Sequence, residues 1–366
     1  MIINEKSETE LSSFYVVFKG SVLNENSTNY GISHLCEHLV CKMFTHLYND
    51  FDRYSISWNA YTSGDSIIYY ISGLDEYVNK YKYEFLTSLL KFDIPKEDFK
   101  TEKKVVIQEY KDTFQDQSET MIGNILRTTY GNYSPIGKLQ SLKDLKYKDV
   151  LEYWNTYLSK PTTIINISKN NDFIGTVDFN EDYPKFYTVD ERDELKLETK
   201  MKFNKSGIAG YIKIYDDFNY VSYILSMLSM SILSPFNNEI REKKGLTYNI
   251  TSYIDRISDT QGMVITELIT TDESTQEVLD IYKMILTDRD KYLTEERFNI
   301  TKDYLTVRNK KQEIERYKHI GKYTTPLNWQ INEILDTITF EKVQEIFDKY
   351  LTYDKWSWVI DKKKFR

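Results

Sequence analysis

The sequence predicts an α+β protein of two similar domains, each with a mostly antiparallel sheet and helices packed on one face. Two observations lead to this prediction. Strand-like and helix-like segments alternate along both halves of the 366-residue chain, as in domains where helices cover a sheet. The segment VLEYWNTYLS at 150–159 also resembles VQEIFDKYLT at 343–352, and a β-rich run follows each. Because these segments lie about half the chain apart, we expect two copies of one fold.

Runs of β-branched and aromatic residues mark the expected strands, and apolar residues three or four apart mark the expected helices. Pro95 stands just ahead of one helical segment, where proline is a start signal. In the first half the expected strands are 14–19, 67–72 and 162–168, and the expected helices are 30–44, 80–90, 96–113 and 150–159. In the second half the expected strands are 208–215, 248–254, 263–268 and 356–360, and the expected helices are 221–242 and 343–352.

A boundary between the two domains is expected in the stretch 170–200. This stretch is rich in Asp, Glu and Lys, contains Pro184 and lacks sustained helical periodicity, as a linker does. We therefore assign residues 1–180 to a first domain and residues 181–366 to a second domain of the same fold.

Composition excludes several classes of protein. Hydrophobic residues make up 40% of the chain and charged residues 28%, which is typical of a globular protein. No apolar run reaches the roughly 18 residues that span a bilayer, so we expect no membrane-embedded segment. The formal net charge of −8 argues against a nucleic-acid partner. The N-terminal residues show no secretory signal, and Cys36 and Cys41 are the only cysteines, so we expect a cytoplasmic protein with reduced thiols.

The pentapeptide His34-Leu-Cys-Glu-His38 is the first pattern that carries chemistry, because the chain has only four histidines and two of them lie here. On a helix, residues three and four apart share a face, so His34, Glu37 and His38 project together. Two imidazoles one turn apart can both reach a Zn²⁺ ion at about 2.0–2.1 Å, and the carboxylate beside them can take a proton from water. The alternative is an ordinary helix with two histidines on its polar face.

A third zinc ligand is expected from the helix at 96–113. Glu102 and Glu109 are seven residues apart, which places both carboxylates on one face of that helix, two turns apart. One of them can bind the metal, and the other can orient a ligand histidine through its second ring nitrogen. The alternative for this helix is a solvated charged face.

These patterns together resemble the inverzincin metallopeptidases of the pitrilysin/insulinase family, which includes the mitochondrial processing peptidase. In that family HxxEH is followed about 70 residues later by a helix with ExxxxxxE. The likeness covers nearly the whole chain and implies a zinc-dependent endopeptidase that cleaves short unstructured peptides, such as the leader segment of a precursor. The other matching segments are GS…E…GISH at 20–34, NAYTS at 59–63 with IYY at 68–70, and SPF…REKKGLTY at 234–248.

The resemblance implies a role for each candidate residue of the first, catalytic domain. Glu37 becomes the general base, and Glu102 becomes the carboxylate that supports a ligand histidine. Cysteine ligation is the alternative, but Cys36 follows His34 by two residues and so points away from the histidine face. The implied ligands of one Zn²⁺ per chain are His34, His38 and Glu109.

Two further elements of the family concern the substrate. Arg241 and Tyr248 of the second domain would hold the substrate backbone and stabilise the developing oxyanion. For Arg241 the alternative is a cation at a helix C-terminus beside Gly245.

His46 and His319 have no partners at ligand spacing and are expected to be structural. The edge strand would bind an extended peptide as an added strand, through Trp58, Asn59, Ala60 and Tyr61.

The resemblance also bears on partners. Family members of this length pair with a second subunit, so that the zinc site of one chain meets the Arg/Tyr element of the other. This sequence has both elements, which favours a homodimer, and the alternative is a heterodimer with a related subunit. Two other functions are open at this point: a catalytically silent scaffold or peptide-binding subunit, and a zinc-dependent binder of leader peptides that does not cleave them.

Overall fold

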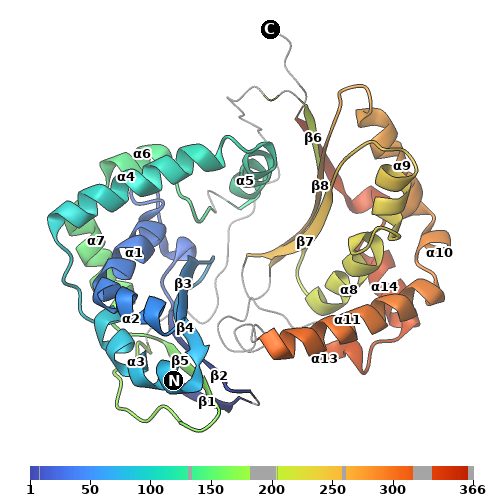
Figure 1. Ribbon diagram of the computed structural model, residues 1–366. Coiled ribbons are helices and arrows are strands. Elements are labelled where there is room, and N and C mark those ends of the chain that lie inside the picture. The colour runs from blue at the N-terminus through green and yellow to red at the C-terminus, as the bar shows by residue number, and fades with distance from the viewer. Residues whose placement is uncertain are drawn as a thin grey trace. The chain divides into compact units, whose positions relative to one another are not determined.

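The computed structural model describes residues 1–7, 9–130, 134–181, 203, 205–257, 261–315 and 332–361. Contacts divide these residues into two compact units (Figure 1). Residues 1–113 and the described residues from 130 to 181 form the first unit. Residues 114–129 and the described residues from 203 to 361 form the second. Most of the predicted linker, 182–200, lies outside the described residues.

The first unit is built on a five-stranded sheet. Its strands are β1 (Ile2–Lys6), β2 (Leu11–Phe18), β3 (Ser57–Thr62), β4 (Ile67–Leu74) and β5 (Thr163–Ser168). Their order is β1-β5-β2-β4-β3, so β3 lies at one edge of the sheet. β1 runs parallel to β5, and the other neighbouring strands are antiparallel.

Helices cover one face of this sheet. Alternate side chains of β2 explain why, because Phe14, Val16 and Phe18 point into a buried core that includes Leu35 and Leu39. The helices are α1 (Ile32–Cys41), α2 (Tyr48–Arg53), α3 (Asp75–Leu89), α4 (Lys96–Thr113), α6 (Leu139–Asp144) and α7 (Tyr147–Tyr153). The 3-10 segments Val22–Asn24 and Lys42–Leu47 and the π-helical segment Trp154–Leu158 adjoin them.

The second unit repeats the sheet of the first. Its strands are β6 (Ser206–Ile214), β7 (Ile250–Arg256), β8 (Gly262–Thr270) and β9 (Ser357–Asp361). Their order, β7-β8-β6-β9, is antiparallel throughout and matches β3-β4-β2-β5 of the first sheet. The prediction of two similar α+β domains is therefore confirmed.

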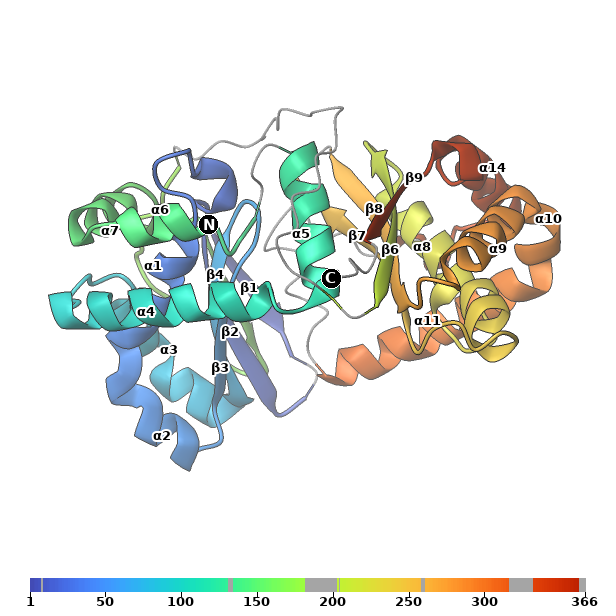
Figure 2. The same cartoon turned by 90° about the horizontal axis from the view of Figure 1, so that it is seen from above.

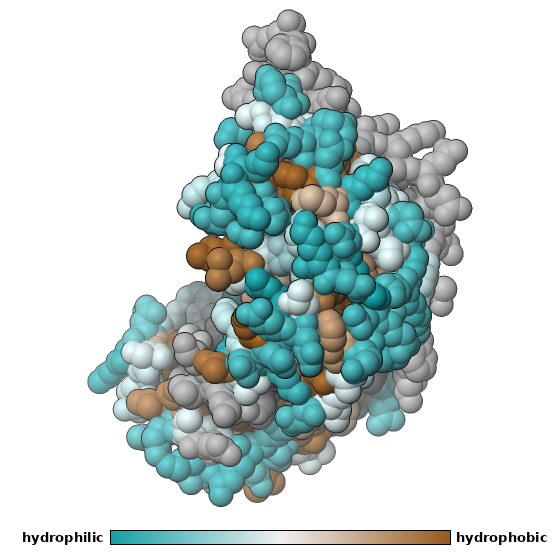
Figure 3. All heavy atoms as spheres, turned by 90° about the vertical axis from the view of Figure 1, so that its right-hand side faces the viewer, coloured by the Kyte–Doolittle hydropathy of each residue, from teal (hydrophilic) through white to brown (hydrophobic). Residues whose placement is uncertain are grey.

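Most helices of the second unit pack on one face of its sheet. Ile208 and Val264 point from the strands into a core that Leu225 and Leu228 complete. Seen from the right of Figure 1, the surface is mostly hydrophilic with separate hydrophobic patches (Figure 3). Among the described residues, no helix is both long and apolar enough to cross a bilayer. The elements are α8 (Phe218–Ser229), the π-helical segment Asn237–Glu242, α9 (Thr275–Thr287), α10 (Arg289–Tyr292), α11 (Glu295–Glu315), α13 (Asn332–Leu335), α14 (Phe340–Tyr350) and the 3-10 segment Tyr353–Lys355.

Helix α5 (Gln117–Thr129) follows α4 in the sequence but packs on the second sheet. It lies on the face opposite to α8, as Figure 2 shows. Gly207 of β6 makes room for it, because a Cβ atom at this position would lie 3.3 Å from the sulfur of Met121. Gln117 also donates a hydrogen bond of 2.9 Å to the carbonyl of Lys205. The second sheet therefore has helices on both of its faces, whereas the sequence predicts helices on one face only.

One predicted helix, 221–242, is wrong. Helix α8 ends at Ser229, and a separate π-helical segment begins at Asn237. Pro235 has no N–H to donate to the preceding turn, and its ring disfavours a continuous helix. The side chain of Asn237 then caps the end of α8 by donating a 2.6 Å hydrogen bond to the carbonyl of Ser229. The helix predicted at 96–113 is confirmed as α4.

Candidate metal centre

A buried carboxylate fixes the first turn of α1, the helix that carries both histidines. Gly31 precedes the helix with a φ of 92°, a conformation that favours glycine. Glu25, upstream in the chain, accepts hydrogen bonds from the N–H groups of Gly31 (2.8 Å) and Ser33 (2.9 Å) and from Oγ of Ser33 (2.5 Å). It therefore takes the place of a side-chain N-cap. Burial raises the pKa of Glu25 to about 7.

The ring centres of His34 and His38 lie 4.8 Å apart on α1. Helix α4 packs beside α1 and places Oε2 of Glu109 3.7 Å from Nε2 of His34 and 3.4 Å from Nε2 of His38. One ligand atom from each of the three residues lies within 4.8 Å of the others. Ligands of a tetrahedral zinc ion stand about 3.4 Å apart, so this donor set fits Zn²⁺ with one coordination position left open.

Glu102 is buried behind His38. Its Oε2 lies 3.3 Å from Nδ1 of His38, and its Oε1 lies 2.9 Å from Nζ of Lys42. A carboxylate at Nδ1 holds the ring so that Nε2 faces Glu109. In the described part of the chain, Nδ1 of His34 is buried without a hydrogen-bond partner. Burial, and then the charge of His38, lower the pKa of His34 to about 4, which keeps this ring in the neutral form that binds metals.

Glu37 lies on the same helix and is 9% exposed. Oγ1 of Thr62, the last residue of β3, donates a hydrogen bond of 2.6 Å to Oε2 of Glu37. Burial raises the pKa of Glu37 above its ordinary value, and the Thr62 hydrogen bond and the charge of His38 act in the opposite direction. The sequence pattern does not identify Thr62 as a site residue. The one sequence feature that points to it is its position at the end of the expected edge strand.

The two thiols are not part of this cluster. Cys36 is fully buried in the core of the first unit, and burial raises its pKa well above the ordinary value. Cys41 is a free thiol as well. The structure gives no support to cysteine ligation. His46 lies on the surface, where its Nε2 is 3.3 Å from Oε1 of Glu84, and His319 lies outside the described residues.

The edge strand β3 pairs with β4 along one of its sides. Trp58 stacks on Tyr48 with ring centres 4.8 Å apart, which anchors the strand to the helices. Asn59 is exposed, and its Oδ1 accepts a hydrogen bond of 2.9 Å from the backbone N–H of Ala60. Ala60 and Tyr61 are half-buried. At a sheet edge, backbone groups of this kind can pair with an added strand.

Arg241 and Tyr248 lie together in the second unit. The guanidinium carbon of Arg241 is 5.4 Å from the centre of the Tyr248 ring, and Nε of Arg241 is 3.4 Å from Oε1 of Glu242. Gly245, with a φ of 65°, ends the helical turn between them, and its N–H donates to the carbonyl of Arg241 (2.8 Å). Tyr248 precedes β7, which begins at Ile250, and is 87% exposed. Arg241 therefore lies in the last turn of a helical segment as well as against Tyr248.

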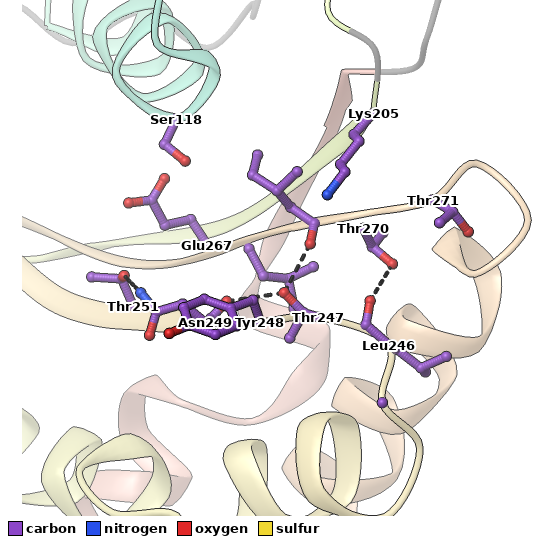
Figure 4. Close-up of a pocket in the computed structure, with 13 residues that line it drawn as sticks. Ser118, Lys205, Leu246, Thr247, Tyr248, Asn249, Thr251, Glu267, Thr270 and Thr271 are labelled. Carbon is purple, nitrogen blue, oxygen red and sulfur yellow. Dashed lines mark hydrogen bonds between the residues drawn. The ribbon is translucent and has the colours of Figure 1, made fainter.

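A pocket of about 410 Å³ lies beside Tyr248 (Figure 4). The loop from Gly245 to Asn249, the end of β8 and Ser118 of α5 line it. Glu267 points toward Ser118, and its Oε2 is buried with no hydrogen bond to any described residue. Burial raises the pKa of Glu267 to about 7. No pattern in the sequence singles out this carboxylate, because α5 and β8 meet only in the folded unit.

Both halves of the chain match known protein families. Residues 1–138 match the model described as insulinase (peptidase family M16), and residues 167–305 match the model described as the peptidase M16 inactive domain. The chain belongs to the insulinase (M16) peptidase family. The match to the inactive domain agrees with the sequence of α8. This helix follows the first strand of the second sheet as α1 follows β2 in the first unit, but it has no histidine.

Relatives of this M16 protein include two bacterial proteins. The uncharacterized zinc protease YmxG of Bacillus subtilis is 28% identical over 64% of this chain and 63% of its own length, so the match spans less than two thirds of that relative. An uncharacterized zinc protease of Rickettsia felis is 26% identical over 88% of this chain and 85% of its own length. A protease from Helicobacter pylori has the same fold, with a TM-score of 0.79 and 15% identity, covering 98% of this chain and 96% of that one.

Proposed function

We propose that this M16 protein is a zinc metalloendopeptidase that cleaves short unstructured peptides, such as the leader segment of a precursor. The observation that supports the proposal most is the convergence of His34, His38 and Glu109 beside the buried Glu37. Both bacterial relatives are named zinc proteases, which supports zinc as the metal. We propose one Zn²⁺ per chain.

The residues of the first unit would divide the chemistry among them. His34, His38 and Glu109 would hold the ion, and Glu102 would fix the ring of His38. When bound, zinc supplies Lewis-acid chemistry, which polarises a carbonyl and makes water more acidic. Glu37 accepts a proton from the water that attacks the scissile carbonyl, and it returns the proton to the leaving amine as the C–N bond breaks.

The peptide would bind in an extended form by pairing with the edge of β3, along Trp58, Asn59, Ala60 and Tyr61. Arg241 and Tyr248 would hold the peptide backbone and stabilise the negative charge that develops on the carbonyl oxygen. The exposed ring of Tyr248 and its contact with the Arg241 guanidinium support this role. We propose that a partner subunit completes the site, in a homodimer or in a heterodimer with a related chain.

A second candidate is a catalytically silent scaffold or peptide-binding subunit of such a heterodimer. The match of residues 167–305 to the inactive M16 domain favours it. The complete donor set of the first unit favours the peptidase instead. The free thiols Cys36 and Cys41 support a cytoplasmic location for either function, because reduced cysteines are typical of that compartment.

The test is cleavage of a mixed library of unstructured peptides by the purified chain, with bound zinc quantified. Wild type should cleave, and Glu37→Gln should bind the same amount of zinc without cleaving. Glu97→Gln is a matched control, because Glu97 is an exposed carboxylate on α4 that pairs only with Lys100 in the described chain. Zinc in all three proteins without cleavage by any would point to a missing partner subunit, a very narrow substrate or the silent subunit. Cleavage by Glu37→Gln would contradict the role given to Glu37.

A further inference from the structure

The carboxylate of Glu37 is held by a hydroxyl from the edge strand. Oγ1 of Thr62 donates to Oε2 of Glu37 at 2.6 Å, and the backbone of Thr62 also hydrogen-bonds to this carboxylate. Thr62 ends β3, and α1, which carries Glu37, packs against β3. The two residues are 25 positions apart in the sequence, so the fold brings them together.

Covalent geometry alone does not orient this carboxylate. The last side-chain torsion of glutamate is broad and roughly two-fold, so hydrogen-bond partners decide the plane of the carboxylate. His34 and His38 share the helix with Glu37, but neither is hydrogen-bonded to it in the part of the chain that the structure describes. The orientation of the Glu37 carboxylate therefore depends on Thr62.

We propose that Thr62 is a positioning residue for Glu37, and that its hydroxyl, by holding Oε2, fixes the orientation in which the carboxylate accepts the proton. The inference rests on the proposed peptidase function and extends it to a residue of the substrate strand. A general base must lie within hydrogen-bond reach of the proton that it takes, and a carboxylate held in one orientation meets that requirement.

Because Thr62 ends β3, the strand would hold the general base as well as bind the peptide. Residues 58–61 would pair with the peptide, and the next residue in the same strand holds the base. A shift of the peptide by one residue along β3 would move the scissile bond by about 3.3 Å, which is enough to take it out of reach of Glu37. The register of the peptide and the orientation of the base are therefore set by one strand.

The experiment compares Thr62→Val, which removes the hydroxyl and keeps the shape, with Thr62→Ser, which keeps the hydroxyl. In the full chain with zinc, Thr62→Val should lower kcat by roughly tenfold to a hundredfold, as expected for loss of a hydrogen bond to a charged group. KM and bound zinc should stay within about twofold, and Thr62→Ser should recover most of kcat. Ser57→Ala is the control, because it removes a hydroxyl at the other end of β3 that bonds to the carbonyl of Ser72 (3.1 Å).

A purely structural hydroxyl would give a different result, namely lower thermal stability of Thr62→Val with an unchanged kcat per folded molecule. That result, or a Thr62→Ser protein as slow as Thr62→Val, would overturn the inference. Thr62→Ala replaces Thr62→Val if the latter does not fold. Glu37→Gln measured in parallel distinguishes the positioning role of Thr62 from the proposed peptidase function. An inactive Glu37→Gln with a fully active Thr62→Val refutes only the positioning role. An active Glu37→Gln refutes the proposed function itself.

Discussion

Nδ1 of His38 lies 3.3 Å from Oε2 of Glu102, a residue that is only 6% exposed. Its other oxygen is 2.9 Å from Nζ of Lys42, so Glu102 has a cation on one side and a candidate ligand on the other. This arrangement places the carboxylate where it can orient the imidazole.

We expect Glu102→Gln to weaken zinc binding by roughly tenfold to a hundredfold, the range found when a group that orients a ligand histidine is lost. Competition with a zinc-binding dye measures the affinity. Glu97→Gln on the exposed face of the same helix should leave it unchanged. Equal affinities in Glu102→Gln and wild type would show that Glu102 does not support the site.

Removal of the metal should destabilise the first unit. A ligand that binds only the folded state raises the free energy of unfolding by about 2.7 kcal/mol when its concentration is a hundred times its Kd. Calorimetry with excess zinc and with a chelator should therefore give a clearly higher Tm in zinc. For Glu109→Ala, which lacks one oxygen of the donor set, the two Tm values should coincide. A zinc effect of full size in that variant would remove Glu109 from the ligand set.

Tyr248→Phe should lower kcat/KM by about tenfold or more, because it removes the hydroxyl that would stabilise the oxyanion. Bound zinc and Tm should not change, since the side chain is 87% exposed and belongs to the second unit. Tyr304→Phe on α11 is the matched control, as this tyrosine is also exposed but is no candidate site residue. If both variants keep the activity of wild type, the role of Tyr248 is wrong.

Glu25 should make the stability of the fold depend on pH. Its pKa is raised from 4.5 to about 7 in the folded protein, so between these values the folded state keeps a proton that the unfolded chain has lost. The free energy of unfolding therefore falls as the pH rises through this window. Glu25→Gln removes this contribution, and the slope against pH should become less negative by up to about 1.4 kcal/mol per pH unit.

Urea unfolding at several pH values between about 5 and 8 measures these slopes. Glu10→Gln is the control, because Glu10 pairs with Lys169 on the surface. Identical slopes in Glu25→Gln and wild type would contradict the burial argument for Glu25.

The elements with strong local signals could be predicted from the sequence. Helix α4 has Pro95 before it and a regular apolar pattern, and its bounds agree with the prediction. The prediction at 221–242 failed because the apolar pattern continues through a break that depends on Pro235 and on the side-chain cap from Asn237. A periodic pattern reports which residues are buried, and it carries little information about where a helix stops.

The candidate site likewise has a part that the sequence predicts and a part that depends on tertiary packing. Helical spacing alone places His34 and His38 on one face of α1. The approach of Glu109 and the hydrogen bond from Thr62 depend on how α4 and β3 pack against α1, which is tertiary information. The N-cap role of Glu25 is likewise invisible in a sequence where Gly31 stands at the cap position.

Helix α5 belongs to the first unit by its position in the sequence and to the second unit by its packing. It is encoded between α4 and α6 of the first unit, yet its apolar residues, among them Met121 and Ile125, are buried as part of the second. A protein cut at residue 180 would give one fragment with an exposed apolar helix and another whose β6 faces solvent at Gly207. Such fragments should recognise each other through that helix, so neither half of this chain is a free-standing module.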